Sequence, residues 1–297
     1  CDGEAEAAVS LDNIESVISG STAGASFGAT LSALGDVDGD GFDDFAMGAP
    51  KGGPSRGGQV FIVYGSPTRI GASTDTASGT AFHMEQNGAD FGVSITGADL
   101  DGDGTGDIII GAPLYDSVAL TDAGIVWVVY SEASNRPVSG ALTTSDPRTN
   151  YVVGLAGQVY LGSAVDGGGD IDGDGFADLL IGAPWPWITQ IPPLGGINFV
   201  LRGKSGRYVT AGGINAGDLV QIYGESSQIL GINVAHAGDL DGNGYSDFLA
   251  VGLGSEGRGS SSYENHGITY VIGGGDPSRF PTGTAATLNA SELTIGT

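Results

Sequence analysis

Side chains with oxygen atoms recur at fixed offsets in four short segments of the chain. The segments read DVDGDGFDD (36–44), DLDGDGTGD (99–107), DIDGDGFAD (170–178) and DLDGNGYSD (239–247). In each of them positions 1, 3, 5 and 9 carry a carboxylate or an amide oxygen, and positions 4 and 6 are glycine. Alternate residues of a tightly curled loop can point at one centre, and glycine permits the positive φ angles that such a curl needs. Because Ca²⁺ takes six to eight hard oxygen ligands, the spacing predicts one calcium site per segment, about four ions in all.

Five positions of each loop are the predicted metal ligands. Position 7 would contribute its backbone carbonyl, so its side-chain type is free to vary. The predicted ligands are Asp36, Asp38, Asp40, Phe42 and Asp44 in the first loop, Asp99, Asp101, Asp103, Thr105 and Asp107 in the second, Asp170, Asp172, Asp174, Phe176 and Asp178 in the third, and Asp239, Asp241, Asn243, Tyr245 and Asp247 in the fourth. Since Asn243 is a neutral ligand, we expect the fourth loop to bind calcium more weakly.

Two other interpretations of these segments are weaker. Segments rich in Asp-Gly are also ordinary exposed turns, but four copies with oxygen atoms at the same offsets disfavour that interpretation. EF-hand loops begin with the same residues, yet they run to twelve residues, end in Glu and are flanked by helices. Here each loop closes at position 9, and a strand-like run follows.

Short apolar runs surround each loop and must position it. After the first loop come DFAMGAP and then GQVFIVYG, and a weaker run such as TAFHME precedes the Phe-Gly or Leu-Gly pair ahead of each loop. These runs are rich in β-branched and aromatic residues, are bounded by glycine, and are too short for typical helices. They therefore predict about four antiparallel strands around each loop.

The arrangement of loop and strands is repeated along the chain. The first aspartates of successive loops are 63, 71 and 69 residues apart. Four-stranded sheets repeated around an axis predict an all-β fold, a β-propeller of four-stranded antiparallel blades. The predicted repeats span 14–76, 77–147, 148–214 and 215–284, after an N-terminal tether at 1–13. A last strand at 285–297 would close the ring or belong to a next blade.

Phe-Gly, the aspartate loop and Gly-Ala-Pro together resemble the FG-GAP repeat of integrin α-subunit propellers and their bacterial relatives. Phe-Gly stands at 27–28 and 91–92, Leu-Gly at 161–162 and 230–231, Gly-Ala-Pro at 48–50, 111–113 and 182–184, and Gly-Leu-Gly at 252–254. The resemblance covers about residues 14 to 297. It implies a calcium-binding propeller whose metal loops join the two inner strands of each blade on one face, with ligands often bound at loops on the opposite face. Relatives usually have seven blades, so the four repeats are either a segment of a larger ring or a four-bladed ring with an extra closing strand.

Charge and cysteine content limit the partners and the location. The formal net charge is −25 with ten Lys and Arg residues, which disfavours a nucleic-acid partner because phosphate contacts need clustered basic side chains. No apolar run approaches the roughly 18 residues needed to span a bilayer. The only cysteine is Cys1, which suits a lipoprotein tethered to a membrane through lipidated Cys1, although an arbitrary fragment boundary is the alternative. We expect an extracytoplasmic protein, at the cell surface or secreted.

No catalytic constellation is recognisable in the sequence. The three histidines His83, His236 and His266 are scattered, and the obvious paired carboxylates belong to the loops. The leading hypothesis is a non-catalytic module for adhesion to a surface protein or glycan. The alternatives are a polysaccharide-acting lyase or hydrolase with its site in the propeller depression, and a self-associating structural unit of a cell-surface assembly. The segment PWPWITQIPPL (184–194), with Trp185 and Trp187, is the most unusual candidate platform for a ligand.

Overall fold

The described part of the chain consists of strands joined by turns and loops. The computed structural model describes residues 17–67, 74–75, 79–143, 147–154, 156–184, 195–208, 213–214, 218–224, 229–254, 266–275 and 287–289. Within these residues every assigned element from β1 to β19 is a strand, which confirms the predicted all-β class. The search for a membrane-spanning helix, limited to the same residues, found none that is long and apolar enough.

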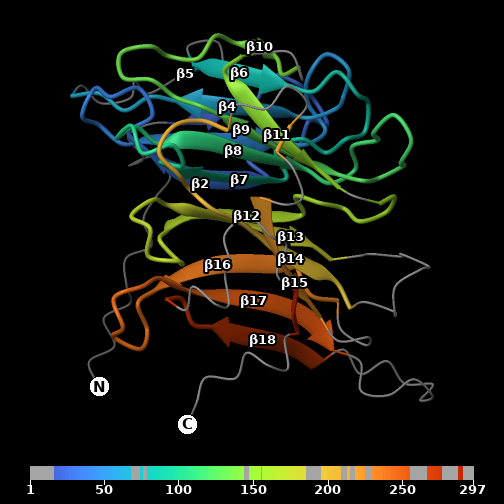
Figure 1. The fold of residues 1–297 in the computed structure, drawn as a ribbon. Coiled ribbons are helices and arrows are strands. Elements are labelled where there is room, and N and C mark those ends of the chain that lie inside the picture. Colours follow the sequence, from blue (N-terminus) through green and yellow to red (C-terminus); the bar gives the residue numbers. More distant parts are fainter. Residues whose placement is uncertain are drawn as a thin grey trace, which may run out of the picture.

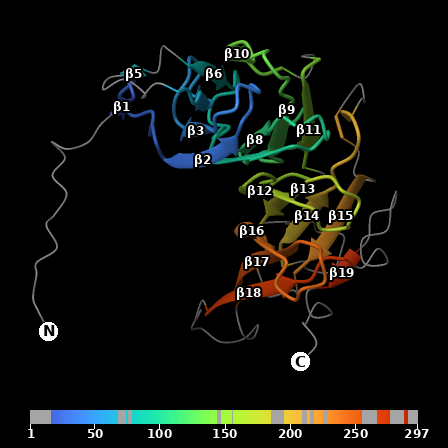
Figure 2. The ribbon, with the colours of Figure 1, turned by 90° about the vertical axis from the view of Figure 1, so that its left-hand side faces the viewer.

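Four sheets, here called blades, follow one another along the chain and lie side by side in an arc (Figures 1 and 2). The first blade contains β2 (Thr30–Gly35), β3 (Asp44–Ala49), β4 (Gln59–Val63) and β6 (Thr80–His83). The second contains β7 (Ser94–Ala98), β8 (Asp107–Ala112), β9 (Ile125–Val129) and β11 (Thr149–Val153). The third contains β12 (Ala164–Gly169), β13 (Asp178–Ala183), β14 (Ile197–Leu201) and β15 (Leu219–Tyr223), and the fourth contains β16 (Asn233–Gly238), β17 (Asp247–Gly254) and β18 (His266–Ile272). The first three blades are four-stranded and antiparallel between these strands, as the sequence predicted, and three strands of the fourth blade are described.

The blade and the sequence repeat are offset by one strand. The strand that precedes each Phe-Gly or Leu-Gly pair, such as β6, pairs with the three strands before it and not with those after it. A further short segment crosses back to the outer edge of the preceding blade. There β10 (Gly140–Ala141) runs parallel to β6, and β19 (Thr287–Asn289) runs parallel to β15. The described part of 285–297 thus adds to the edge of the third blade, as a fifth strand.

A similar parallel pair stands at the start of the described chain. There β5 (Thr74–Asp75), which follows the third strand of the first blade, runs parallel to β1 (Ile18–Ser19). In this small sheet β5 corresponds to β10, and β1 corresponds to β6. The strand β1 therefore occupies the place of a blade's outer strand.

The hydrophobic core lies in three seams between neighbouring blades. One cluster joins Val60 and Ile62 of the first blade to Ile108 and Ile110 of the second. Equivalent clusters join the second blade to the third and the third to the fourth. Because both faces of β8 and β13 are covered, all six residues of each strand are buried, which explains their continuous apolar sequences.

The Phe-Gly and Gly-Ala-Pro motifs meet at these seams. A Cβ atom on Gly111 would lie 2.2 Å from the carbonyl oxygen of Gly162 in the next blade, and one on Gly182 would lie 2.2 Å from that of Gly231. Side chains are excluded where the two backbones approach so closely. In the last three Phe-Gly or Leu-Gly pairs the residue before the glycine, such as Leu161 before Gly162, is fully buried. The repeated glycines therefore set the spacing between blades.

Candidate metal centres

The four aspartate loops are the hairpin turns between the first and second strands of the four blades. They connect β2 to β3, β7 to β8, β12 to β13 and β16 to β17. The glycines at positions 4 and 6 of all four loops have positive φ angles, from 71° to 91°. This confirms the backbone curl that the glycine spacing predicted.

Acidic side chains gather within each loop. The groups whose carboxylate oxygens lie within 4.8 Å of one another are Asp36, Asp38 and Asp40; Asp99, Asp101 and Asp107; Asp170, Asp172 and Asp178; and Asp239, Asp241 and Asp247. Three loops therefore bring together positions 1, 3 and 9, and the first loop brings together positions 1, 3 and 5. The predicted ligands Asp44, Asp103 and Asp174 lie in the same turns but outside these groups.

The aspartate at position 1 organises the turn. In the first loop the carboxylate of Asp36 accepts hydrogen bonds from the N–H groups of Gly39 at 2.7 Å and Gly41 at 2.8 Å. Burial alone would raise the pKa of Asp36, but these bonds together with one from Asp40 lower it below its usual value. The bond from position 6 recurs in the other three loops, for example from the N–H of Gly175 to Asp170 at 2.9 Å, and the bond from position 4 recurs in the third and fourth loops.

The aspartate at position 9 ties three segments of a blade together. Asp107 is fully buried, and its two oxygens accept hydrogen bonds from the N–H groups of Leu100 at 3.0 Å and Ser131 at 3.1 Å. Leu100 belongs to the same loop, and Ser131 follows the third strand. Burial raises the pKa of Asp107 to about 8 and that of Asp178 to about 7, with nearby aspartates adding to the shift and backbone hydrogen bonds opposing it. A cation at the loop would offset the cost of these buried negative charges.

The fifth and seventh positions also have defined roles. The oxygen of position 5 accepts the N–H of position 7, as from Phe42 to Asp40 at 3.0 Å. The ring of Phe176 lies against Gly102 of the preceding loop, where a Cβ would come within 2.4 Å of the ring. Tyr245 packs in the same way on Gly173. The side chain at position 7 therefore packs between blades in two loops, a role that the sequence analysis missed.

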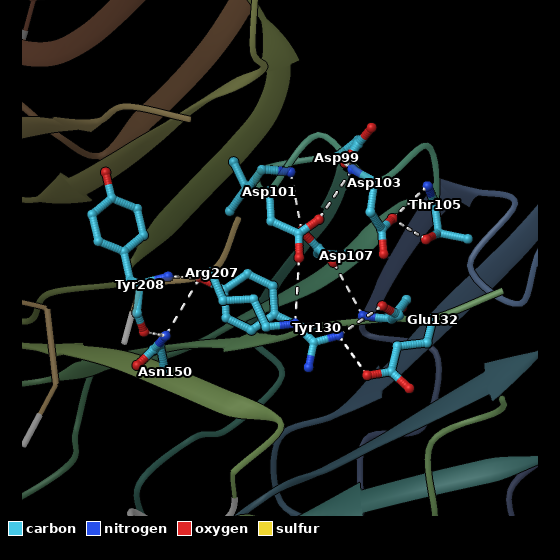
Figure 3. Close-up of polar contacts among 12 residues, drawn as sticks. Asp99, Asp101, Asp103, Thr105, Asp107, Tyr130, Glu132, Asn150, Arg207 and Tyr208 are labelled. Atoms are coloured by element: carbon cyan, nitrogen blue, oxygen red, sulfur yellow. Dashed lines mark hydrogen bonds and ion pairs between the residues drawn. The ribbon is translucent and has the colours of Figure 1, made fainter. Parts of the chain in front are cut away.

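Three loops also hold an arginine at the aspartate of position 3. Arg136 contacts Asp38 at 2.5 Å, Arg207 contacts Asp101 at 3.3 Å, and Arg202 contacts Asp172 at 3.0 Å. Figure 3 shows Arg207 between Asp101 and Glu132, beside the ring of Tyr130. Burial and the neighbouring Asp103 raise the pKa of Asp101, and Arg207 opposes this shift.

These arginines were not among the predicted site residues. A signal was present in the sequence, since Arg136 and Arg207 come six or seven residues after the third strands of consecutive blades. The aromatic residues Tyr64 and Tyr130 directly follow the third strands of the first two blades. Sequence spacing gave no indication that such an arginine reaches the loop of the preceding blade.

The donor atoms in these loops fit a hard divalent cation. The clustered side chains offer carboxylate oxygens, with neither thiolate nor imidazole in the four groups found among the described residues. Oxygen-only donors suit Ca²⁺ or Mg²⁺ better than Zn²⁺ or Cu²⁺.

No histidine belongs to the four acidic groups found among the described residues. His83 contacts the exposed Glu85 at 3.2 Å. Burial lowers the pKa of His236, whose ring nitrogens are enclosed, and Asp166 opposes that shift. His266 begins β18. The Trp185 to Leu194 platform and Cys1 lie outside the described residues.

Comparison with known proteins identifies the repeat. The FG-GAP repeat profile matches residues 27–63, 91–129 and 161–186. The chain is an FG-GAP repeat protein. The predicted fourth repeat is not among the matched segments, although its loop shares with the other three the hydrogen bond from position 6 to position 1 and the positive glycine φ angles.

Integrin α subunits are among the relatives of this FG-GAP protein. Integrin alpha-5 of Xenopus laevis is 31% identical over 231 residues, which cover 75% of this chain and 19% of that protein. Integrin alpha-PS2 of Drosophila melanogaster is 30% identical over 223 residues (73% and 14%), and integrin alpha-V of Gallus gallus is 29% identical over 231 residues (75% and 20%). The chain thus spans about a fifth or less of the length of these relatives. Homology and structure together support blades of the integrin propeller type.

Proposed function

We propose that this FG-GAP protein is a calcium-binding, adhesion-type propeller unit that acts outside the cytoplasm. Each of the four loops binds one Ca²⁺ through positions 1, 3, 5 and 9 and the carbonyl of position 7. The observation that supports this most directly is the recurrence of three carboxylate oxygens within 4.8 Å of one another in every loop. Four chance clusters at equivalent turns of four blades would be a poor account of that repetition.

The bound ion would stabilise each hairpin. Like charges crowded into one turn repel, and Asp107 and Asp178 are buried as well. Calcium at about 100 times its Kd adds roughly 2.7 kcal/mol per site to the free energy of unfolding. The test is calorimetric melting in EDTA, in magnesium and in calcium. A marked rise of the melting temperature in calcium supports the proposal, and equal melting temperatures in EDTA and calcium contradict it. Magnesium should substitute poorly, because it requires a stricter octahedral geometry.

The adhesive role comes from homology and from the layout of the loops. The relatives named above are integrin α subunits, and we propose a cell-surface or secreted location with a protein or glycan ligand. The connections between the second and third strands, such as 51–58 and 114–123, lie at the opposite end of the blades from the metal loops. They carry no metal ligands and can vary, and Val118 in one of them is fully exposed.

The segment 184–194, which follows the second strand of the third blade, is the connection whose part in ligand binding can be tested most directly. The alanine variant of Trp185 and Trp187 and the parent protein are compared for binding to an immobilised glycan panel and to intact cells, in calcium. Weaker binding by the variant, at an unchanged melting temperature, supports this platform. Unchanged binding to every target that the parent recognises excludes it, and turnover of a polysaccharide by the parent would favour the enzymatic alternative.

A structural assembly is the second candidate function, because the outward faces of the first and fourth blades are less covered than the faces inside the arc. Leu31 in β2 is 69% exposed, whereas the residues at the same register in the next three blades, Ile95, Val165 and Val234, are at most 8% exposed against the preceding blade. At the other end of the arc, Leu249 is half-buried where the equivalent Leu180 is fully buried. The three internal seams indicate that each open face fits the opposite face of an FG-GAP blade.

We propose that a second copy of the chain supplies that blade. Sedimentation velocity over a range of concentrations would then show association of the parent protein. Leu31→Asp should reduce this association, and the matched variant Val118→Asp, at an exposed valine of a distant loop, should not. A parent protein that stays monomeric at every concentration contradicts the assembly.

A further inference from the structure

Two of the candidate metal loops receive an arginine from the blade that follows them. Arg136 comes from the segment after β9 of the second blade and contacts Asp38 of the first. Arg207 comes from the segment after β14 of the third blade and contacts Asp101 of the second. In both cases the arginine contacts the aspartate at position 3 of the metal loop.

The contacts of the two arginines match in more than the ion pair. The guanidinium carbon of Arg136 lies 4.1 Å from the ring centre of Tyr64, and that of Arg207 lies 5.2 Å from the ring centre of Tyr130. Each tyrosine directly follows the third strand of the blade that owns the loop. A planar guanidinium suits such a site, because it can stack on a ring and bind a carboxylate at the same time.

Backbone hydrogen bonds fix the segments that carry these arginines. The N–H of Ser134 donates to the carbonyl of Asp38 at 2.6 Å, and the N–H of Gly206 donates to the carbonyl of Asp101 at 2.8 Å. A backbone hydrogen bond one or two residues before each arginine thus holds the arginine's segment against the loop. The docking makes the pairing a feature of the seam between blades rather than a chance contact of two long side chains.

The aspartates need a positive partner at this place. Asp38 is 3% exposed and Asp101 is 6% exposed. A buried carboxylate without a partner is costly, and the chain has only ten basic residues against 35 acidic ones. Two of those ten are placed where a metal ion would otherwise be the nearest source of positive charge.

We propose that Arg136 and Arg207 are built-in counter-cations of the first two loops, which hold these loops folded without calcium and lower their calcium affinity. The inference rests on the proposed calcium binding. Each guanidinium pairs with a carboxylate that the ion also uses, so it stabilises the empty loop and repels the ion. Repulsion between a unit charge and a divalent ion that share a carboxylate corresponds to about a tenfold loss of affinity even at the dielectric constant of water.

The loops should therefore differ in their need for calcium. The third loop has a pairing of another kind, since Arg202 comes from its own blade. In the fourth loop the Asp241 carboxylate accepts hydrogen bonds from the side-chain amide of Asn243 at 3.1 Å and from its backbone N–H at 3.0 Å, and no arginine from the described residues contacts it. We expect the fourth loop to be the least ordered in EDTA, and the first two to remain ordered.

The opposite effect on affinity is also physically possible. An arginine that only oriented Asp101 would favour the ion, and its removal would weaken calcium binding. The two roles therefore predict changes of opposite sign for the same substitution.

Hydrogen exchange measured by mass spectrometry can follow each loop separately during a calcium titration. In Arg207→Gln the peptide that contains 99–107 should exchange faster in EDTA, and its calcium midpoint should fall about tenfold. The peptide that contains 239–247 in the same variant should keep its midpoint. Arg207→Lys keeps the charge and should keep a midpoint near that of the parent. Arg56→Gln is the control, since it removes an exposed charge at the opposite end of the first blade.

The outcomes separate the two proposals. A midpoint of 99–107 that is unchanged or higher in Arg207→Gln overturns the counter-cation role, while calcium binding by the parent stands. A parent without calcium-dependent protection in any loop overturns the proposed calcium binding instead. If Arg207→Gln does not fold, Arg136→Gln and the peptide 36–44 provide the same test, because that arginine is half-exposed and less central to its seam.

Discussion

Asp107→Asn is the sharpest test of the proposed metal loops, because its effect should depend on calcium. The carboxylate of Asp107 is fully buried and accepts hydrogen bonds from Leu100 and Ser131. Asparagine has nearly the same shape but one acceptor oxygen, so one of the two N–H groups loses its partner. A buried donor without a partner costs about 1–3 kcal/mol.

Besides the hydrogen bond, the substitution removes an unfavourable buried charge in EDTA and a metal ligand in calcium. In EDTA the buried charge is itself unfavourable, as the raised pKa of Asp107 shows, and asparagine removes that cost. The net change should then be small. In calcium the ion already offsets the charge, and the variant also loses a ligand that contributes up to about 2.7 kcal/mol at 100 times Kd. The expected loss in calcium is about 4–6 kcal/mol, or about 8–24 °C in melting temperature.

Calorimetric melting of parent and variant in EDTA and in millimolar calcium measures this difference. Asp43→Asn is the charge-matched control, since Asp43 is exposed and directly precedes the equivalent aspartate of the first loop. The control should change little in either condition. An equal loss of stability for Asp107→Asn in EDTA and in calcium would refute the link between this carboxylate and the ion.

Two further substitutions test the unequal loops and the seams. Asp101→Ala should weaken calcium binding in titration calorimetry more than Asn243→Ala, because Asp101 is a buried charged ligand in a group with Asp99 and Asp107, and equal losses would contradict the ligand-charge argument. Gly111→Ala should destabilise the protein by about 3 kcal/mol or more, because its methyl group would meet the backbone of the next blade at 2.2 Å. Gly267→Ala in β18, where the structure leaves space, should change the melting temperature little, and similar effects of the two would refute the role of Gly111 at the seam.

The sequence alone predicted the strands around the loops and the curl of each loop. Periodic apolar runs and glycine pairs are local signals, and the positive φ angles of Gly102 and Gly104 confirm that the signal was interpreted correctly. The assignment of strands to blades was not local. A strand such as β6 lies between two repeats, and only its pairing with β4 shows which blade it completes. Loop lengths and residue types were equally compatible with either neighbour.

Contacts across the seams were also beyond prediction from spacing. Arg207 and Asp101 are 106 residues apart, and nothing in the order of the chain pairs them. The reason lies in the return path of the chain, since in the second and third blades the segment after the third strand crosses back over the preceding blade before it forms the outer strand. A repeat with this path places its own residues in its neighbour's site. Predictions that treat each repeat as a closed unit will therefore miss them.

The same path gives the metal loops a part in holding blades together. In the first three loops position 4 must be glycine for two reasons, since it needs a positive φ angle and leaves space for the next blade. At Gly39 the space is taken by Ala133, at Gly102 by Phe176 and at Gly173 by Tyr245. An ion that fixes the curl of one loop would therefore also fix the surface on which the next blade packs. Calcium binding and blade packing should be energetically coupled through these glycines, so that loss of one ion loosens the seam that follows it along the chain.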